Sequence, residues 1–435
     1  MSTTHEILLK SVTLPDGSTS DLLIRDGKIA EISSTLPTAG EVIECVGLRV
    51  LPGFVDLHTH LREPGKENAE TVLTGSQAAV RGGYTALSAM ANTNPVADTA
   101  GVVEQVWRLG IEAGLCEVFP IGAVSEGLEG VKLAEIGAMA NSAAKVRIFS
   151  DDGKCVSDAL LMRRALEYVK SFDGVIAQHA QEPRLTENAQ MNEGPVASEL
   201  GLAGWPAVAE ESIIARDILL AHSVGSRLHI CHLSTKGSVE IVRWAKSQGM
   251  AVTAEVTPHH LILTDEAARS YDPIYKVNPP LRTQADVDAL RAGLADGTID
   301  IVATDHAPHP GEDKDCEWAS AALGMVGLET AFSIVYTTMV ESGLMSWQRL
   351  IEVMSVKPAE IGGYANQGQE ISIGSIANLT IVDPKAERVI DRNDLFSKGK
   401  NTPFHGSHLR GDVVHTIFRG KVVLRDQEMT GVVHE

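Results

Sequence analysis

Two histidines separated by one residue, His58 and His60, indicate chemistry more clearly than any other short motif in this sequence. They follow the apolar segment 54–57, which has the pattern of a buried strand. Side chains on a strand alternate between its two faces, so both imidazoles should point the same way. Neutral imidazole binds zinc, nickel, iron or copper. The pair predicts one side of a metal site, with two histidines at a strand end and no metal as the simpler alternative.

Further side chains of the kinds that bind metals stand near the ends of later strand-like segments. These are Asp151, Asp152, His179, His232 and Asp305. With the first two histidines they are sufficient for two metals that share a bridging carboxylate. Paired metals lower the pKa of bound water and polarise a carbonyl oxygen, and a nearby carboxylate can carry the proton to a leaving nitrogen. The set predicts hydrolysis of an amide-like C–N bond, or its reversal.

The elements that must position these side chains are strands alternating with helices. The strand-like segments are 54–60, 84–92, 117–123, 145–151, 174–180, 227–233, 250–256 and 300–306. Helical patterns such as 158–171, 207–222 and 284–294 lie between them. Eight such units predict an α/β fold with a (β/α)8 TIM-type barrel, whose strand ends face one mouth. The competing open, doubly wound sheet lacks its GxGxxG loop after the first strand.

Both ends of the chain are rich in strand patterns. Segments 7–14, 21–32 and 41–50 show β-branched alternation, and the stretch from about residue 369 resembles them. We expect the two ends to meet in one small β-sandwich domain made of 1–50 plus 369–435. The catalytic barrel should then occupy residues 51–368.

Composition limits the classes of partner. The chain of 435 residues is 44% hydrophobic and 22% charged, which is typical of a globular protein with a large core. A net charge of −20 argues against nucleic acid and anionic membranes, but not against a small anionic substrate held by a local arginine or metal. No apolar run approaches the roughly 20 residues that span a bilayer. Without a signal-peptide pattern, and with five scattered cysteines, the chain is expected in the cytoplasm.

Several motifs together resemble the amidohydrolase superfamily and, within it, the bacterial class I dihydroorotases. They are DLHTHLREPG, ANTNP, FSDDG, CHLST, AEVTPHHL, VNPPLR, ATDHAPH and GLETAF. The resemblance covers essentially the whole chain, and the ordered set is far more specific than HxH alone. It implies a zinc-dependent cyclic amidohydrolase that interconverts N-carbamoyl-L-aspartate and L-dihydroorotate in de novo pyrimidine (UMP) biosynthesis.

The resemblance also implies one or two zinc ions and a ligand set. The matching residues are His58, His60 and Asp305 for one zinc, His179 and His232 for the other, and Asp152 as the bridge. Many relatives bridge their metals with a carbamylated lysine, whereas this chain has Asp151-Asp152 and no lysine before Lys154. Strand periodicity does not decide between the two aspartates. The ungapped match to the family favours Asp152 and leaves Asp151 as a supporting residue or helix cap.

Roles around the substrate follow from the same resemblance. A metal-bound hydroxide attacks the ring amide carbonyl, and Asp305 is the general acid/base as well as a ligand. Arg62 matches the residue that pairs with the substrate's α-carboxylate, where a planar guanidinium can bind both oxygens. The remaining substrate contacts match His60, Asn92, Asn278 and His309, together with the backbone of Leu323 and Gly324. The less typical loop 311–323 is a candidate lid over this site.

Two alternatives remain. A hydantoinase, dihydropyrimidinase or allantoinase would share the barrel and the ligands but generally uses the bridging lysine. An inert scaffold partner of aspartate transcarbamoylase should have lost metal ligands.

The resemblance further implies a homodimer, or an association with aspartate transcarbamoylase. Outside the site, we interpret His229 as structural and Glu210-Glu211 as a solvated helix start.

Overall fold

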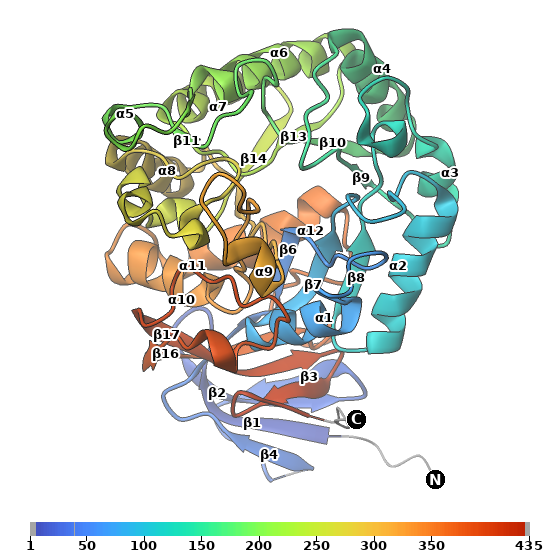
Figure 1. Cartoon of the computed structure of the whole chain (residues 1–435). Helices are drawn as coiled ribbons and strands as arrows, with labels where there is room; N and C mark the ends of the chain where they lie inside the picture. The colour runs from blue at the N-terminus through green and yellow to red at the C-terminus, as the bar shows by residue number, and fades with distance from the viewer. Residues whose placement is uncertain (1–5, 39, 431–435) are drawn as a thin grey trace.

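The computed structural model describes residues 6–38 and 40–430 of the chain. The protein is a mixed α/β structure in which parallel strands and helices lie above a separate β-sheet domain (Figure 1). Among the described residues, no helix combines the length and the apolar character needed to cross a membrane.

Parallel strands form the interior of the larger part. One sheet contains β6 (Phe54–Thr59), β7 (Tyr84–Ala89) and β8 (Glu117–Pro120). The other contains β9 (Ile148–Phe149), β10 (Val175–Gln178), β13 (Leu228–Ile230), β14 (Val252–Val256) and β15 (Ile301–Val302). Isolated parallel bridges join the two sheets on both sides, from Gly122 to Phe149 and from Thr59 to His306. Each segment with a predicted strand pattern therefore contains a strand, although most strands are shorter than the pattern.

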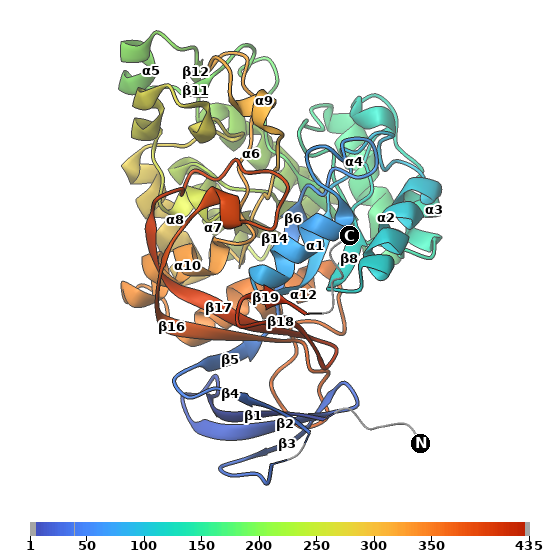
Figure 2. The ribbon, with the colours of Figure 1, turned by 60° about the horizontal axis from the view of Figure 1, so that its bottom comes forward.

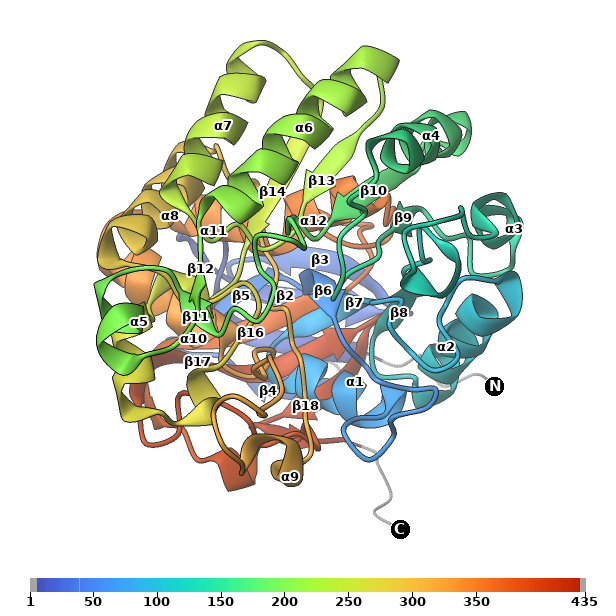
Figure 3. The same cartoon turned by 45° about the horizontal axis from the view of Figure 1, so that its top comes forward.

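Helices cover these strands on the outside, as Figure 3 shows. The longer ones are α1 (Val72–Arg81), α2 (Ala100–Ala113), α4 (Ala159–Val169), α6 (Val208–Val224), α7 (Lys236–Ser247) and α8 (Gln284–Asp296). Polar caps define several of their starts: Asp158 accepts from Leu161 N, and Thr235 from Ser238 N. Strands β6 and β7 are buried along their whole length, including their polar residues such as Asp56 and His58.

Shorter elements connect this framework. The short helices are α3 (Ile136–Asn141), α5 (Pro195–Leu200), α9 (Gly311–Lys314), α10 (Ala331–Val335), α11 (Trp347–Ile351) and α12 (Lys357–Gly362). Strands β11 (Met191–Asn192) and β12 (Gly204–Trp205) pair with each other. Helix α9 begins the segment 311–323, which the sequence marked as a candidate lid.

The two ends of the chain meet in one nine-stranded sheet. Its N-terminal strands are β1 (Glu6–Thr13), β2 (Thr19–Arg25), β3 (Lys28–Ser33), β4 (Glu41–Glu44) and β5 (Arg49–Pro52). Its C-terminal strands are β16 (Leu379–Val389), β17 (His408–Phe418), β18 (Lys421–Arg425) and β19 (Glu428–Met429). The antiparallel pairing of β5 with β16 joins the two groups, and Figure 2 shows β16 and β17 between the N-terminal strands and the helices. An apolar cluster drawn from both groups, including Ile24 and Ile381, packs inside this domain.

Candidate metal centre and catalytic pocket

The predicted ligands stand at or just beyond the carboxyl ends of five parallel strands. Strand β6 carries His58, with His60 directly after it, and Asp152, His179, His232 and Asp305 follow β9, β10, β13 and β15. All six side chains are buried. Because carboxyl ends of neighbouring parallel strands meet at one edge, these distant residues converge on one cluster.

Asp152 lies at the centre of that cluster. Its Oδ1 is 3.3 Å from His58 Nε2, 3.1 Å from His179 Nδ1 and 3.3 Å from His232 Nε2. Its Oδ2 is 3.3 Å from His60 Nε2. Burial alone would raise the pKa of Asp152, but His58 and the other imidazoles hold it well below its usual range. One ionised carboxylate therefore faces four imidazoles, three of them at Oδ1 and one at Oδ2.

Asp305 closes the cluster on the side of the first histidine pair. Its Oδ1 lies 3.1 Å from His60 Nε2 and 3.5 Å from His58 Nε2. Burial would raise the pKa of Asp305, but His58 and His60 lower it to about 2, so the group is a carboxylate at neutral pH. Asp305, His232 and Arg62 have φ values of 47°, 31° and 64°. Such left-handed backbone is uncommon for non-glycine residues, and these three examples lie at or beside the cluster.

Asp151 points away from the histidines. Its Oδ1 accepts hydrogen bonds from Val124 N at 2.8 Å and Ser125 N at 3.0 Å, and the Ser125 hydroxyl donates to its other oxygen. Asp151 therefore fixes the segment after β8 beside the cluster. Of the two adjacent aspartates, Asp152 is the one among the imidazoles.

Each of three imidazoles is held by its second nitrogen. His58 Nδ1 donates to Glu255 Oε1 at 2.6 Å, His60 Nδ1 to Asn92 Oδ1 at 2.9 Å, and His179 Nε2 to Gln181 Oε1 at 2.7 Å. These partners leave the other nitrogen of each ring directed towards Asp152. Outer partners of this kind orient imidazoles for metal binding.

Glu255, on β14, is a site residue that the sequence reasoning missed. Besides His58, it accepts hydrogen bonds from His229 Nε2 at 3.0 Å and His232 N at 3.1 Å. Burial would raise the pKa of Glu255, but His58 and His229 hold it well below its usual range. A lone acid in the otherwise uncharged segment 250–256 was the signal that could have identified it. His229 is buried between Glu255 and Thr253, as its structural interpretation predicted.

The cluster fits divalent metal ions. His58 Nε2 is fully buried and has no hydrogen-bond partner, although an imidazole nitrogen in that position needs one. Groups of three donors lie within 4.8 Å of one another, among them His58, His232 and Asp305, and also Asp152, His179 and His232. Nitrogen and carboxylate donors in these numbers suit zinc and other borderline divalent metals.

A cavity of about 190 Å³ opens over the cluster, and every residue predicted to contact substrate lines it. They are His60, Arg62, Asn92, Asn278, His309, Leu323 and Gly324. A cavity of this size suits a small metabolite better than a drug-sized ligand.

Arg62 supplies the positive charge of this cavity. Its Nε donates to Pro308 O at 3.2 Å, and burial lowers the pKa of Arg62 to about 10, so the guanidinium stays charged. His309 is neutral because burial and the nearby Arg62 lower its pKa to about 3. The cavity therefore offers a fixed cation beside a neutral imidazole, and this arrangement can bind a carboxylate.

Another wall of the cavity carries polar groups from two segments, one with Asn278 and one with Leu323 and Gly324. Asn278 Nδ2 donates to Gln181 Oε1 at 3.1 Å, while Asn278 Oδ1 is buried without a partner. His309 Nε2 donates to Leu323 O at 3.0 Å. Gly324 has φ 144°, and a Cβ there would lie 2.8 Å from Ala307 Cβ, so only glycine allows the backbone to approach so closely.

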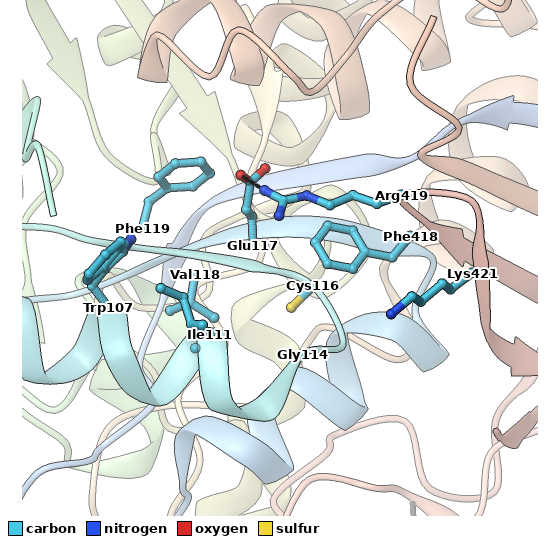
Figure 4. A pocket seen from close by; sticks show the side chains of 11 residues that line it. Trp107, Ile111, Gly114, Cys116, Glu117, Val118, Phe119, Phe418, Arg419 and Lys421 are labelled. Atoms are coloured by element: carbon cyan, nitrogen blue, oxygen red, sulfur yellow. Dashed lines mark hydrogen bonds and ion pairs between the residues drawn. The ribbon is translucent and has the colours of Figure 1, made fainter. Parts of the chain in front are cut away.

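A larger cavity of about 430 Å³ lies elsewhere, between α2, the start of β8 and the β17–β18 turn (Figure 4). Trp107, Phe119 and Phe418 line it, and Glu117 pairs with Arg419 across it. In the described part of the chain, none of the His, Cys, Asp and Glu clusters able to hold a metal lies there. Volume alone therefore does not identify the reaction site.

One interpretation outside the site is wrong. Glu210 is buried and accepts hydrogen bonds from Ser234 N at 3.0 Å and Ser238 Oγ at 2.6 Å. It joins the start of α6 to the start of α7, instead of facing solvent. The partners are more than 20 residues away in sequence, so local pattern contained no sign of them.

Comparisons with known proteins agree with this geometry. A family model described as Dihydro-orotase-like matches residues 47–238. A dihydroorotase of Streptomyces coelicolor is 65% identical over 97% of this chain and 99% of its own, and one of Mycobacterium tuberculosis is 55% identical over 94% and 96%. An L-hydantoinase (dihydropyrimidinase) of Arthrobacter aurescens has a similar structure, with a TM-score of 0.87, 28% identity and coverage of 99% and 98%.

Proposed function

Since the chain belongs to the dihydroorotase family, we propose that its buried histidine–aspartate cluster is the metal centre of that reaction. The enzyme is a cyclic amidohydrolase that interconverts L-dihydroorotate and N-carbamoyl-L-aspartate in pyrimidine biosynthesis. The observation that carries the assignment to this cluster is Asp152, one ionised carboxylate surrounded by four imidazoles at the floor of a small cavity.

We expect zinc at this centre, with His58, His60 and Asp305 on one ion, His179 and His232 on the other, and Asp152 between them. Zinc bound there would lower the pKa of water and polarise the amide carbonyl. Glu255, Asn92 and Gln181 fix the ring orientations, so the nitrogens that would bind the ions need little rearrangement.

Asp305 is the residue placed to move the proton. Its pKa of about 2 keeps it ionised, so it can accept the proton of the water that attacks the amide carbonyl. It would then deliver that proton to the ring nitrogen as the C–N bond breaks, and ring closure uses the same path in reverse. Asp305 lines the cavity, and its Oδ1 lies 3.1 Å from His60 Nε2.

The cavity walls would orient the substrate. Arg62 pairs with the α-carboxylate, supported by Asn92 and His309, while Asn278 and the backbone of Leu323 and Gly324 hold the ring amide. The unpartnered Asn278 Oδ1 is an acceptor for a ring N–H. The neutral state of His309 avoids a second cation beside Arg62.

We further propose that the parallel strands form a (β/α)8 barrel over residues 51–368, with a β-sandwich domain of 1–50 plus 369–435. The two bridges that join the parallel sheets support a closed ring of strands. The pairing of β5 with β16 supports the composite domain. A cytoplasmic homodimer, alone or with aspartate transcarbamoylase, is the expected assembly, which light scattering after gel filtration would test.

The deciding experiment measures metal content and turnover of dihydroorotate in the wild type, Asp152→Ala and Asp151→Ala. We expect up to two metals per chain and activity in the wild type, and loss of both in Asp152→Ala. Asp151→Ala should retain more of each because its carboxylate faces Val124 and Ser125. Hydantoin and dihydrouracil serve as parallel substrates. If the wild type holds both metals and acts on hydantoin or dihydrouracil but not on dihydroorotate, the protein is a hydantoinase. If it has neither metal nor activity, the protein is a scaffold.

A further inference from the structure

Two segments that each begin with a short helical turn bring polar groups to one wall of the catalytic cavity. Segment 273–278 ends in Asn278, and segment 311–324 ends in Leu323 and Gly324. They touch directly, since Gly324 N donates to Lys276 O at 3.0 Å. Their relative position therefore sets the distance between the groups proposed to hold the ring amide.

Lys314, at the end of α9, reaches from the second segment into the first. Its Nζ donates to Pro273 O at 3.0 Å and Lys276 O at 3.0 Å. A third bond, to Ala322 O at 2.8 Å, closes its own segment. The side chain is only 8% exposed, so these carbonyls replace its hydration.

Lys276 makes the reciprocal connection. Its Nζ donates to Trp318 O at 2.7 Å and Ala319 O at 3.0 Å, both in the second segment. Lys276 is 5% exposed, and Trp318 packs in an apolar cluster with Met191 and Ala268. Each segment thus contributes one ammonium group that binds carbonyls of the other.

Neither lysine has a carboxylate partner among the ion pairs of the described residues. Burial lowers the pKa of Lys276, and burial together with Lys276 lowers the pKa of Lys314 to about 7. Burying two neighbouring amines is costly, most of all when both carry a proton, and an apolar residue would avoid that cost. The five hydrogen bonds to carbonyls are therefore the contribution that lysines make at these positions and apolar residues could not.

We propose that Lys276 and Lys314 are positioning residues for the reaction, holding segments 273–278 and 311–324 at the separation that substrate binding requires. This inference rests on the proposed function for its effect on turnover, but its structural content is independent. Neither lysine lines the catalytic cavity itself, so each acts through Asn278, Leu323 and Gly324.

The test uses full-length, metal-loaded Lys276→Met, Lys314→Met and the double variant. Since hydrogen bonds from a charged group contribute on the order of 1.5–3 kcal/mol, KM for dihydroorotate should rise roughly ten- to a hundredfold in each single variant. Metal content should stay at the wild-type level. Because the two lysines hold the same pair of segments, the double variant should be little worse than the poorer single one.

Hydrogen exchange gives a readout that does not depend on turnover. Amides of residues 315–324 should exchange faster in both single variants. Lys170→Met is the matched control, because Lys170 Nζ also donates to a backbone carbonyl, Val224 O at 3.1 Å, but lies exposed beyond α4. The proposal would be overturned if the lysine variants showed unchanged KM and unchanged exchange. It would also be overturned if they melted at a lower temperature and lost metal while KM stayed the same. If the wild type does not turn over dihydroorotate, the proposed function fails, and exchange alone decides the role of the lysines.

Discussion

At the scale of single residues, the site depends on groups that do not face the cavity. His58 has Asp152 and Asp305 on one side of its ring and Glu255 on the other. Glu255 also binds His229 and the backbone of His232, so one buried carboxylate orients elements from β6 and β13. Removing its charge should therefore affect the metal centre while leaving every proposed ligand in place.

Glu255→Gln should lower metal affinity by roughly ten- to a hundredfold, the usual effect of losing an outer partner of a metal-binding histidine. The amide keeps the size of the side chain but accepts the His58 N–H less strongly. Titration with a chelator, followed by activity, measures the loss. Glu240→Gln, on the exposed face of α7, should leave affinity unchanged. Equal affinity in wild type and Glu255→Gln would contradict the role given to this residue.

At the scale of elements, helix α6 supports the strand that precedes His179. Asp217 on α6 is fully buried and accepts from Gln178 Nε2, on β10, at 2.7 Å. Its neighbour Arg216 donates to Val156 O at 2.7 Å, in the segment that follows Asp152. The helical pattern of this segment was visible in the sequence, whereas the pairing of its buried Asp217 was not.

This element predicts a pH dependence of stability. Burial raises the pKa of Asp217 to about 6, although Arg216 lowers it in part. The folded protein therefore binds this proton more tightly than the unfolded chain, so the stabilisation is complete below about pH 4 and is lost as the pH rises to about 6. The change amounts to about 3 kcal/mol in the free energy of unfolding.

Asp217→Asn should remove that part of the pH dependence between pH 4 and pH 6, as measured by urea unfolding. The quantity to compare is the slope of the free energy of unfolding against pH, and not the free energy itself. The slope reports the titration of Asp217, whereas loss of the Arg216 contact changes the free energy at every pH. Asp173→Asn, at an exposed position, should retain the wild-type slope. A slope for Asp217→Asn equal to that of the wild type would refute the assignment of this proton to Asp217.

At the scale of the whole molecule, a buried ion pair joins the β-sheet domain to the catalytic part. Arg81, at the end of α1, donates to both carboxylate oxygens of Asp412 on β17, at 3.0 Å each, and to Val413 O at 3.2 Å. Arg388 lies 3.6 Å from the same carboxylate. Asp412 therefore balances two cations at the contact between the two parts.

Asp412→Ala should reduce the free energy of unfolding by about 3–5 kcal/mol, since it leaves buried cations unpaired. Urea unfolding measures the loss, with Glu126→Ala as the control. Glu126 pairs with Lys132 on the surface, where a pair contributes about 0–1 kcal/mol. Replacing both partners, Arg81→Met with Asp412→Leu, should recover much of the stability. A loss below about 1 kcal/mol in Asp412→Ala would show that the contact does not depend on this pair.

The sequence by itself determined the local features of this protein. Alternation predicted that His58, on β6, and His60, directly after it, point the same way, and each strand-like segment between residues 54 and 306 contains the strand it predicted. Such features depend on neighbours within a few residues, so periodicity is enough to detect them. The family motifs, taken in their order along the chain, then indicated which of these residues have functional roles.

Only the tertiary structure decided which distant groups meet. Asp151 and Asp152 are adjacent and chemically identical, yet one binds Val124 and Ser125 and the other lies among four imidazoles. Glu255 acts through His58, almost 200 positions earlier in the chain. Lys276 and Lys314 bind only backbone carbonyls, which have the same chemistry at every residue and leave no pattern in a sequence. Contacts of this kind arise when the strands bring remote segments together, and for that reason local pattern could not reveal them.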